Sequence, residues 1–298
     1  PNLMSSEQYA IYNNEIAERN GTPLPFTDEQ IAQYASGADP VKFPSTNWAD
    51  LTFADYSPEW RNTLSISGGN DRVKYFVSGD HIDQNGLYES GALQFQQYQL
   101  RSNIDIQVFE PLSIGVDLSG RFGNRQEPGV DAGFIYKHIY TNEPTELAFF
   151  SNGFPAFGGE NGANPVVMSS NESGLVERVD NNLRTRLSFD LSLDRLTKGL
   201  SVRGFAGIRR WTTDTKSWYT PWTYYSQLEG SDDFIPATGF SQRGPDNILN
   251  ERFWKFDELM LNATIHYEKS FSRHNFKSFI GTERFTSTSR EFSAERKG

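Results

Sequence analysis

The sequence predicts an all-β protein that forms part of an antiparallel transmembrane β-barrel, with about eight long strands and short helices in the extracellular segments. Three observations support this fold class. Polar and apolar side chains alternate with a period of two, the strands are long enough to cross a bilayer, and short and long connections alternate along the chain.

The alternation is clearest between Gln97 and Gly123, where two strands meet at a tight turn. One face of the first strand carries Tyr98, Leu100, Ser102, Ile104, Ile106 and Val108, and the other carries Gln97, Gln99, Arg101, Asn103, Asp105 and Gln107. A strand in a soluble domain usually has about 5 to 6 residues, whereas a strand that crosses a bilayer at a tilt needs about 9 to 11. These strands are of the longer kind, which favours a wall with lipid on one face and water on the other.

The connections between strands fall into two classes. Short turns are predicted at 68–71, 109–111, 197–199 and 271–274, and longer connections at 83–92, 124–181 and 213–250. Because the two classes alternate, they lie on opposite rims, as the short periplasmic turns and long extracellular loops of outer-membrane barrels do. This parity places residues 1–58 on the extracellular side and assigns residues 59–298 to a partial barrel. We therefore expect an N-terminal part, including an upward strand, to precede this chain.

Helices are predicted only outside the strands. Ser5 and Thr27 each precede a short helical pattern with early acidic residues, which is typical of N-caps, and a further helix is possible over 132–140. We expect residues 1–45 to form an ordered, irregular surface segment rather than a separate domain.

Composition limits the function classes. With 28 Lys and Arg against 38 Asp and Glu, the chain lacks the clustered cations that nucleic acid requires. It has no Cys, which excludes thiolate chemistry and Cys-based metal sites. The aromatic content of 14% includes residues expected at strand ends as two membrane-interface girdles: Phe122, Trp211 and Trp254 toward the long connections, and Phe109, Tyr267 and Phe271 toward the short turns.

An alternative remains open at this point. Composition alone favours an aromatic-rich soluble protein, such as a β-sandwich carbohydrate-binding module whose apolar faces meet each other. Strand length and the alternation of connections favour the barrel.

A series of short motifs carries a family resemblance. In order they are 9–14, Asp39-Pro40, 43–51, 62–69, 75–78, 83–86, Asn164-Pro165, 198–203 and His274-Asn275. Each is weak alone, but in this order and spacing they resemble the SusC/RagA-like TonB-dependent transporters, over nearly the whole chain. Residues 1–58 resemble the end of the segment that follows the plug and first strand in that family.

The resemblance implies a 22-stranded barrel with an N-terminal plug, in the outer membrane of a Gram-negative bacterium. It also implies a non-enzymatic importer that takes up glycan fragments or peptides with a SusD-like surface lipoprotein, using energy from TonB. These 298 residues contain no plug or TonB-binding box and too few strands for the whole barrel, so TonB is expected to act through an N-terminal region outside them.

Two sets of side chains are candidates for contact with partner or solute. Aromatic residues that stack on sugars or pack on a partner are predicted in the 213–250 connection: Trp218, Tyr219, Trp222, Tyr224 and Tyr225. Some of these would instead pack the loop onto itself. The predicted lumen-facing set is Arg101, Asp105, Asp117, Arg121, Arg184, Arg186, Asp190 and Asp194. Charges of mixed sign in a barrel more often pair with each other or with a plug than with solute.

No chemistry of catalysis is predicted. The sequence has no G-x-S-x-G, H-E-x-x-H, P-loop or G-x-G-x-x-G motif, and its four histidines are scattered. We therefore expect no catalytic residue, metal or cofactor.

Overall fold

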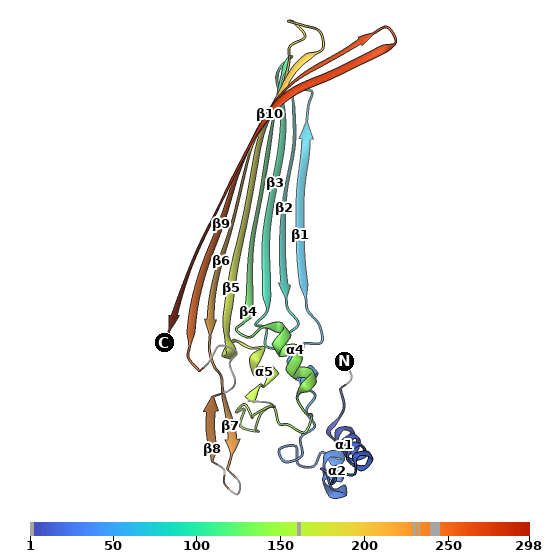
Figure 1. Ribbon diagram of the computed structural model, residues 1–298, viewed down its shortest axis with the longest axis vertical. Helices are drawn as coiled ribbons and strands as arrows, with labels where there is room; N and C mark the ends of the chain where they lie inside the picture. The colour runs from blue at the N-terminus through green and yellow to red at the C-terminus, as the bar shows by residue number, and fades with distance from the viewer. Residues whose placement is uncertain (1–2, 160–161, 229–230, 232, 239–244) are drawn as a thin grey trace.

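The main element of the protein is an eight-stranded antiparallel sheet with the strand order β1-β2-β3-β4-β5-β6-β9-β10 (Figure 1). The computed structural model describes residues 3–159, 162–228, 231, 233–238 and 245–298. The strands are β1 (Glu59–Gly69), β2 (Val73–Asn85), β3 (Gln94–Phe109), β4 (Leu112–Pro128), β5 (Gly174–Ser192), β6 (Leu200–Tyr219), β9 (Ile248–Phe271) and β10 (His274–Lys297). A separate hairpin contains β7 (Thr223–Gln227) and β8 (Phe234–Thr238).

These strands are longer than the sequence pattern indicated. Strand β4 continues to Pro128, β5 begins at Gly174 and β6 continues to Tyr219. The predicted connections 124–181 and 213–250 are therefore too long, and the structure reduces them to 129–173 and 220–247. Polar side chains occupy both faces at these strand ends, so alternation fades while backbone pairing continues.

The sheet buries neither of its faces within the described residues. Side chains on the apolar face are largely exposed, including Leu64 at 79%, Ile66 at 60% and Leu187 at 52%. The other sheet in the described part of the chain is the two-stranded β7–β8, so no second large sheet covers these side chains. The β-sandwich alternative is therefore wrong, and an apolar surface this extensive requires lipid or a partner.

The helices confirm the capping signals in the sequence. Ser5 and Thr27 each form a capping box, at the start of α1 (Ser6–Asn20) and α2 (Asp28–Ser36), and α4 (Ala132–Thr141) lies where a helix was expected. Short helices that were not predicted are α3 (Trp48–Thr52), α5 (Pro165–Met168) and η2 (Asn171–Ser173). Among the described residues, none of the helices has the length and apolar character needed to cross a membrane.

The buried core lies beside one end of the sheet rather than on it. We call this cluster the cap core; it comprises Trp48, Ala49, Tyr88, Val130, Ile135, Ile139, Ala148, Ala163, Val167, Met168 and Trp222. Its members come from the N-terminal segment and the long connections, which gather at the lower end of the sheet in Figure 1, whereas the short turns lie at the upper end. The two classes of connection thus occupy opposite rims, as expected.

Hydrogen bonds attach the N-terminal segment to the cap core. The backbone N–H and the hydroxyl of Thr46 donate to the carbonyls of Pro144 (2.8 Å) and Glu146 (2.6 Å). The indole Nε1 of Trp48 donates to the Glu143 carbonyl at 3.0 Å. One residue, Trp48, therefore both fills the cap core and connects segment 44–48 to segment 143–146.

Replacing Trp48 with Ala is expected to loosen the cap without disrupting the sheet. Truncating a buried Trp to Ala costs about 3 to 5 kcal/mol, and Trp48 is only 1% exposed. Hydrogen exchange on the full-length protein should accelerate in 44–53 and 130–168 and stay unchanged in the strands. The control is Trp60→Ala, because Trp60 is 68% exposed. Equal exchange in the two variants would contradict the proposed role of Trp48.

Candidate functional site

The charged side chains of the central strands share one face of the sheet. Directly paired residues lie on the same face, and the register places seven of the predicted lumen-facing residues together: Arg101, Asp105, Asp117, Arg121, Arg184, Arg186 and Asp190. We call this the polar face. Asp194 differs, because it lies in the turn after β5, where its Oδ1 accepts the Gly199 N–H at 2.6 Å. Its expected position among the strand residues is therefore wrong.

Many of these groups are engaged with their neighbours. Asn103 receives a hydrogen bond from Arg101 at 3.0 Å and donates to Asp117. Asp190 pairs with Arg203 at 2.7 Å. The guanidinium of Arg186 lies 4.1 Å from the ring centre of Phe205. Of these contacts, the one between Asp190 and Arg203 joins opposite charges, and the others are to an amide or an aromatic ring.

A second charged group lies on the polar face near the long connections. Arg125 on β4 is directly opposite Arg178 on β5, and Thr215 on β6 separates Arg178 from Arg252 on β9. We call Arg125, Arg178 and Arg252 the arginine rung. Like charges directly opposite each other destabilise a sheet unless counterions are near.

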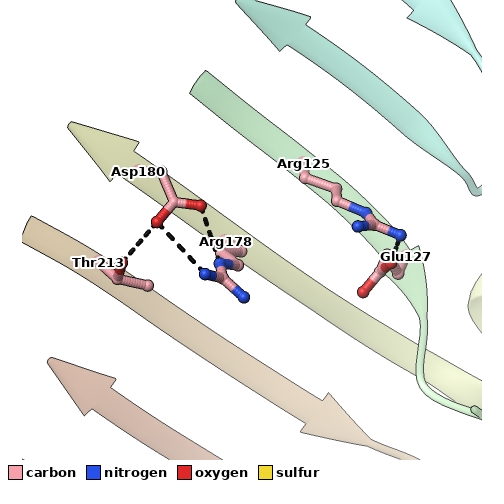
Figure 2. A network of polar contacts seen from close by, with 5 residues as sticks. All are labelled: Arg125, Glu127, Arg178, Asp180 and Thr213. Atoms are coloured by element: carbon pink, nitrogen blue, oxygen red, sulfur yellow. Dashed lines mark hydrogen bonds and ion pairs between the residues drawn. The ribbon is translucent and has the colours of Figure 1, made fainter. Parts of the chain in front are cut away.

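Each arginine of the rung has its own carboxylate partner. Arg125 pairs with Glu127, and Arg178 Nε contacts Asp180 Oδ2 at 2.9 Å (Figure 2). The Thr213 hydroxyl also donates to Asp180 (Figure 2). Arg252 pairs with Glu291 on β10. The result is a row of neutralised guanidiniums, which can exchange an internal carboxylate for one on a solute.

Sequence reasoning missed the arginine rung because it assigned two of its three members to a loop. Arg125 and Arg178 fell inside the predicted 124–181 connection. A usable signal was present, however. Each of these arginines has an acidic residue two positions further along, Glu127 and Asp180, and this spacing places an ion pair on one face of a strand.

Beside the arginine rung the polar face is hollowed. A cavity of about 350 Å³ is lined by Arg178, Trp211, Thr213, Thr215, Arg252, Trp254 and Glu291. The rings of Trp211 and Trp254 meet edge to face, with centroids 5.3 Å apart. Both indoles share the face of Asp180 and Thr213, so their expected place in an interface girdle is wrong. Phe122, by contrast, lies on the apolar face.

The five aromatic candidates do not form one patch. Trp218 and Tyr219 belong to β6 rather than to a loop, and as sequence neighbours in a strand they point to opposite faces. Trp222 is 2% exposed and donates from Nε1 to the Gly162 carbonyl at 2.9 Å, so it is part of the cap core. The prediction of a binding role is wrong for this buried residue.

Tyr225 belongs to a different group, which we call the aromatic platform: Phe150, Phe154, Tyr225 and Phe234. Tyr225 stacks on Phe154 with ring centroids 4.2 Å apart, and its backbone N–H donates to the Pro155 carbonyl at 2.8 Å. Nearby, Tyr224 meets Phe157 edge to face. Phe154 remains 38% exposed, so part of the platform is accessible from its surroundings.

Two carboxylates lie where the N-terminal segment meets the cap core. Burial raises the pKa of Glu146, and the neighbouring Glu143 raises it further. Burial together with a hydrogen bond from its hydroxyl to Glu143 raises the pKa of Tyr9 to about 12. The junction therefore favours protonated groups.

Within the described part of the chain, no group of three or more His, Asp or Glu side chains is arranged to hold a metal ion.

Comparisons with known proteins give relatives of one kind. The chain is 25% identical over 283 residues to TonB-dependent receptor P26 of Formosa agariphila, covering 85% of this chain and 27% of the relative. It is 22% identical over 288 residues to TonB-dependent receptor P3 of the same organism, covering 94% of this chain and 24% of that relative. No family model matches.

Solved structures agree. The RagAB peptide importer in its closed-closed state matches all of this chain and 33% of its own, with a TM-score of 0.69 and 18% identity. Its open-open state matches 85% of this chain and 26% of its own, with a TM-score of 0.64 and 21% identity. The chain thus spans about a quarter of the length of the curated relatives it matches.

These matches confirm the family resemblance and part of the fold. TonB-dependent receptors and RagAB importer structures match over most of the chain, and the eight long strands correspond to part of the RagA barrel. Relatives of this kind are non-enzymatic outer-membrane β-barrel transporters. This agrees with the predicted outer-membrane location and with the prediction that the protein is not an enzyme.

The junction at Glu146 should respond to pH. Because the folded protein holds the Glu146 proton more tightly than the unfolded chain, stability is lost as pH rises from the ordinary Glu range to the raised pKa. Glu146→Gln should therefore slow hydrogen exchange in 44–48 and 143–146 at neutral pH and reduce its pH dependence. Glu172→Gln, at an exposed position, is the matched control. Faster exchange in Glu146→Gln would show that the carboxylate stabilises the junction.

Proposed function

We propose that this chain, a segment similar in sequence and fold to TonB-dependent receptors, forms part of the wall of a 22-stranded outer-membrane importer. The observation that carries the proposal is a single sheet with an uncovered apolar face and an opposite face of paired charges. Lipid satisfies the first face and a water-filled lumen satisfies the second. Residues 59–298 then form barrel wall.

The orientation follows from the two rims. Long connections and the cap lie outside the cell, and the short turns face the periplasm. Residues 1–58, which contain α1, α2 and α3 and join the cap core, are extracellular in this orientation. The polar face then lines the lumen, with the arginine rung and the Trp211–Trp254 cavity near its outer mouth.

Peptides are the solute class that the arginine rung supports best. Guanidiniums bind carboxylates through paired, charge-assisted hydrogen bonds, and every peptide carries a terminal carboxylate. The two indoles beside the rung supply flat surfaces for apolar side chains. Similarity to a peptide importer supports the same class.

Oligosaccharides are a second candidate because of the aromatic platform. The exposed ring of Phe154, held by Tyr225 and Phe234, offers a face on which the apolar side of a sugar can stack. Tyr224 extends the same region through Phe157.

Two protein partners complete the proposal. The RagAB complex supports a SusD-like surface lipoprotein that delivers solute at the extracellular cap. The name of the curated relatives supports energy supply by TonB, through parts of the whole protein outside this chain.

Removing the charge of Arg178 in the full-length transporter should weaken peptide binding. Losing one charge-assisted hydrogen bond costs about 1.5 to 3 kcal/mol, or about 10-fold or more in affinity. Fluorescence anisotropy with a mixture of labelled short peptides would measure the change for Arg178→Gln. The matched control is Arg203→Gln, because Arg203 is also paired to an aspartate on the polar face, near the short turns. An equal loss in both variants would argue against a site at the rung.

Tyr225→Ala tests the oligosaccharide alternative. Losing a ring-to-ring contact worth about 0.5 to 1.5 kcal/mol should reduce binding of neutral oligosaccharides several-fold, because Phe154 loses its support. Titration calorimetry of the full-length transporter gives the affinity, and Tyr56→Ala is the control, since Tyr56 is 79% exposed. Unchanged oligosaccharide binding, together with weakened peptide binding in Arg178→Gln, would leave peptides as the solute.

A further inference from the structure

The apolar face carries a charged group at its long-connection end. On β6, β9 and β10 the register brings together Arg210, Asp257, Lys255 and Arg290. Arg210 is directly opposite Asp257, and Lys255 is directly opposite Arg290. These side chains share the face of Leu183 and Ile208, not that of the arginine rung. We call them the outer cation cluster.

The cluster is compact and has a net positive charge. Asp257 accepts from Arg210 Nε at 2.7 Å and from Lys255 Nζ at 2.9 Å, through different carboxylate oxygens. Arg290 has no acidic partner within the described residues. Three cations thus share one carboxylate. The single aspartate positions two of the cations without neutralising the group.

Toward the short turns the same face is apolar on β6 and β9, while on β10 Arg284 lies directly opposite Leu261. On the side of the short turns, Ile208 lies next to Arg210 on this face of β6, and Leu259 lies next to Asp257 on β9. Leu261 and Ile265 continue the stripe along β9. These side chains are well exposed, with Ile208 at 56% and Ile265 at 48%. From Leu259 to Tyr267 on β9 the stripe approaches the length of strand that crosses a bilayer, which is about 9 to 11 residues.

Cations at such a boundary need a counterion from outside the chain. A charge facing hydrocarbon is costly, whereas a long Arg or Lys side chain at the edge of an apolar band extends into the headgroup layer. Phosphate oxygens are the acceptors there that suit a guanidinium fork and an ammonium group. The charge imbalance of the cluster is therefore complementary to an anionic headgroup.

We propose that the outer cation cluster binds the phosphate of an anionic membrane lipid whose acyl chains lie along the stripe of Ile208, Leu259, Leu261 and Ile265. The inference rests on the proposed function, because it requires the apolar face to meet lipid. Asp257 is a positioning residue in this site, because it contacts both Arg210 and Lys255. The net charge available to a lipid phosphate comes from Arg290 and from the one cation that the aspartate leaves unbalanced.

Native mass spectrometry of the full-length transporter in a neutral detergent tests the site. The probes are phosphatidylglycerol, phosphatidylcholine and inorganic phosphate. The wild type should retain phosphatidylglycerol in preference to phosphatidylcholine. Because one basic residue near an anionic surface contributes about fivefold in affinity, Lys255→Gln combined with Arg290→Gln should weaken phosphatidylglycerol binding by about 25-fold.

A matched double variant controls for charge. Lys277→Gln with Lys297→Gln removes two cations from the polar face of β10, where each is paired to a glutamate. It should retain the lipid. Competition by millimolar inorganic phosphate would show an ion site without a lipid role and would overturn the proposal.

The other outcomes separate this inference from the proposed function. If the wild type inserts into vesicles and the Lys255/Arg290 variant binds phosphatidylglycerol as well as the wild type does, the lipid site is wrong and the barrel wall stands. If the full-length wild type is monodisperse in buffer without detergent and does not insert into vesicles, the proposed function fails and the lipid site fails with it.

Discussion

Continuous backbone pairing across eight strands is the constraint on which the rest of this structure depends. Once β1 to β6, β9 and β10 are paired without a break, every side chain is assigned to one of two faces by its position alone. In a hydrocarbon environment the backbone must be satisfied internally, and such a sheet satisfies it except at its two outer edges. The alternation in sequence then produces two surfaces that require different solvents.

The cap shows how the same chain builds a conventional core where the sheet does not. Residues from the N-terminal segment and from the 129–173 and 220–247 connections bury Trp48, Ile135 and Trp222 together. Asn164 is fully buried and connects two parts of this region. Its side-chain amide donates to the Ala148 carbonyl, and its Oδ1 accepts from the Val166 N–H in the first turn of α5. Long connections become ordered here because they supply one another with apolar partners. That order is what allows the aromatic platform to be presented at a defined place.

The sequence predicted the strands wherever one face was apolar and became unreliable where both faces were polar. Leu112 to Phe122 could be assigned from alternation, whereas Arg125 and Glu127 lie in a strand continuation with no apolar face. Near Arg178 the opposite face of β5 is apolar only in part, because Glu177 interrupts it. The arginine rung was missed for that reason.

Side-chain direction was a second source of error. Trp211 and Trp254 lie at strand ends, as an interface girdle requires, but only the pairing register reveals that they point to the polar face. Trp222 was expected at the surface because its contacts are distant in sequence. Its indole donates to the Gly162 carbonyl, 60 residues away, and it packs in the same buried cluster as Ala163. Capping boxes, in contrast, are local, and both were predicted from neighbouring residues.

The distribution of charge connects the cap, the wall and the membrane. Residues 1–58 contain eight acidic and two basic side chains, so they hold six of the ten net negative charges of the chain. The sheet, which carries most of the basic residues, pairs several cations of its polar face with carboxylates, and near the outer boundary of its apolar face it gathers three cations around Asp257. An anionic lipid surface would repel the first group and attract the second. The repulsion and the attraction favour the same arrangement, in which the apolar band lies in the bilayer and the acidic cap lies outside it.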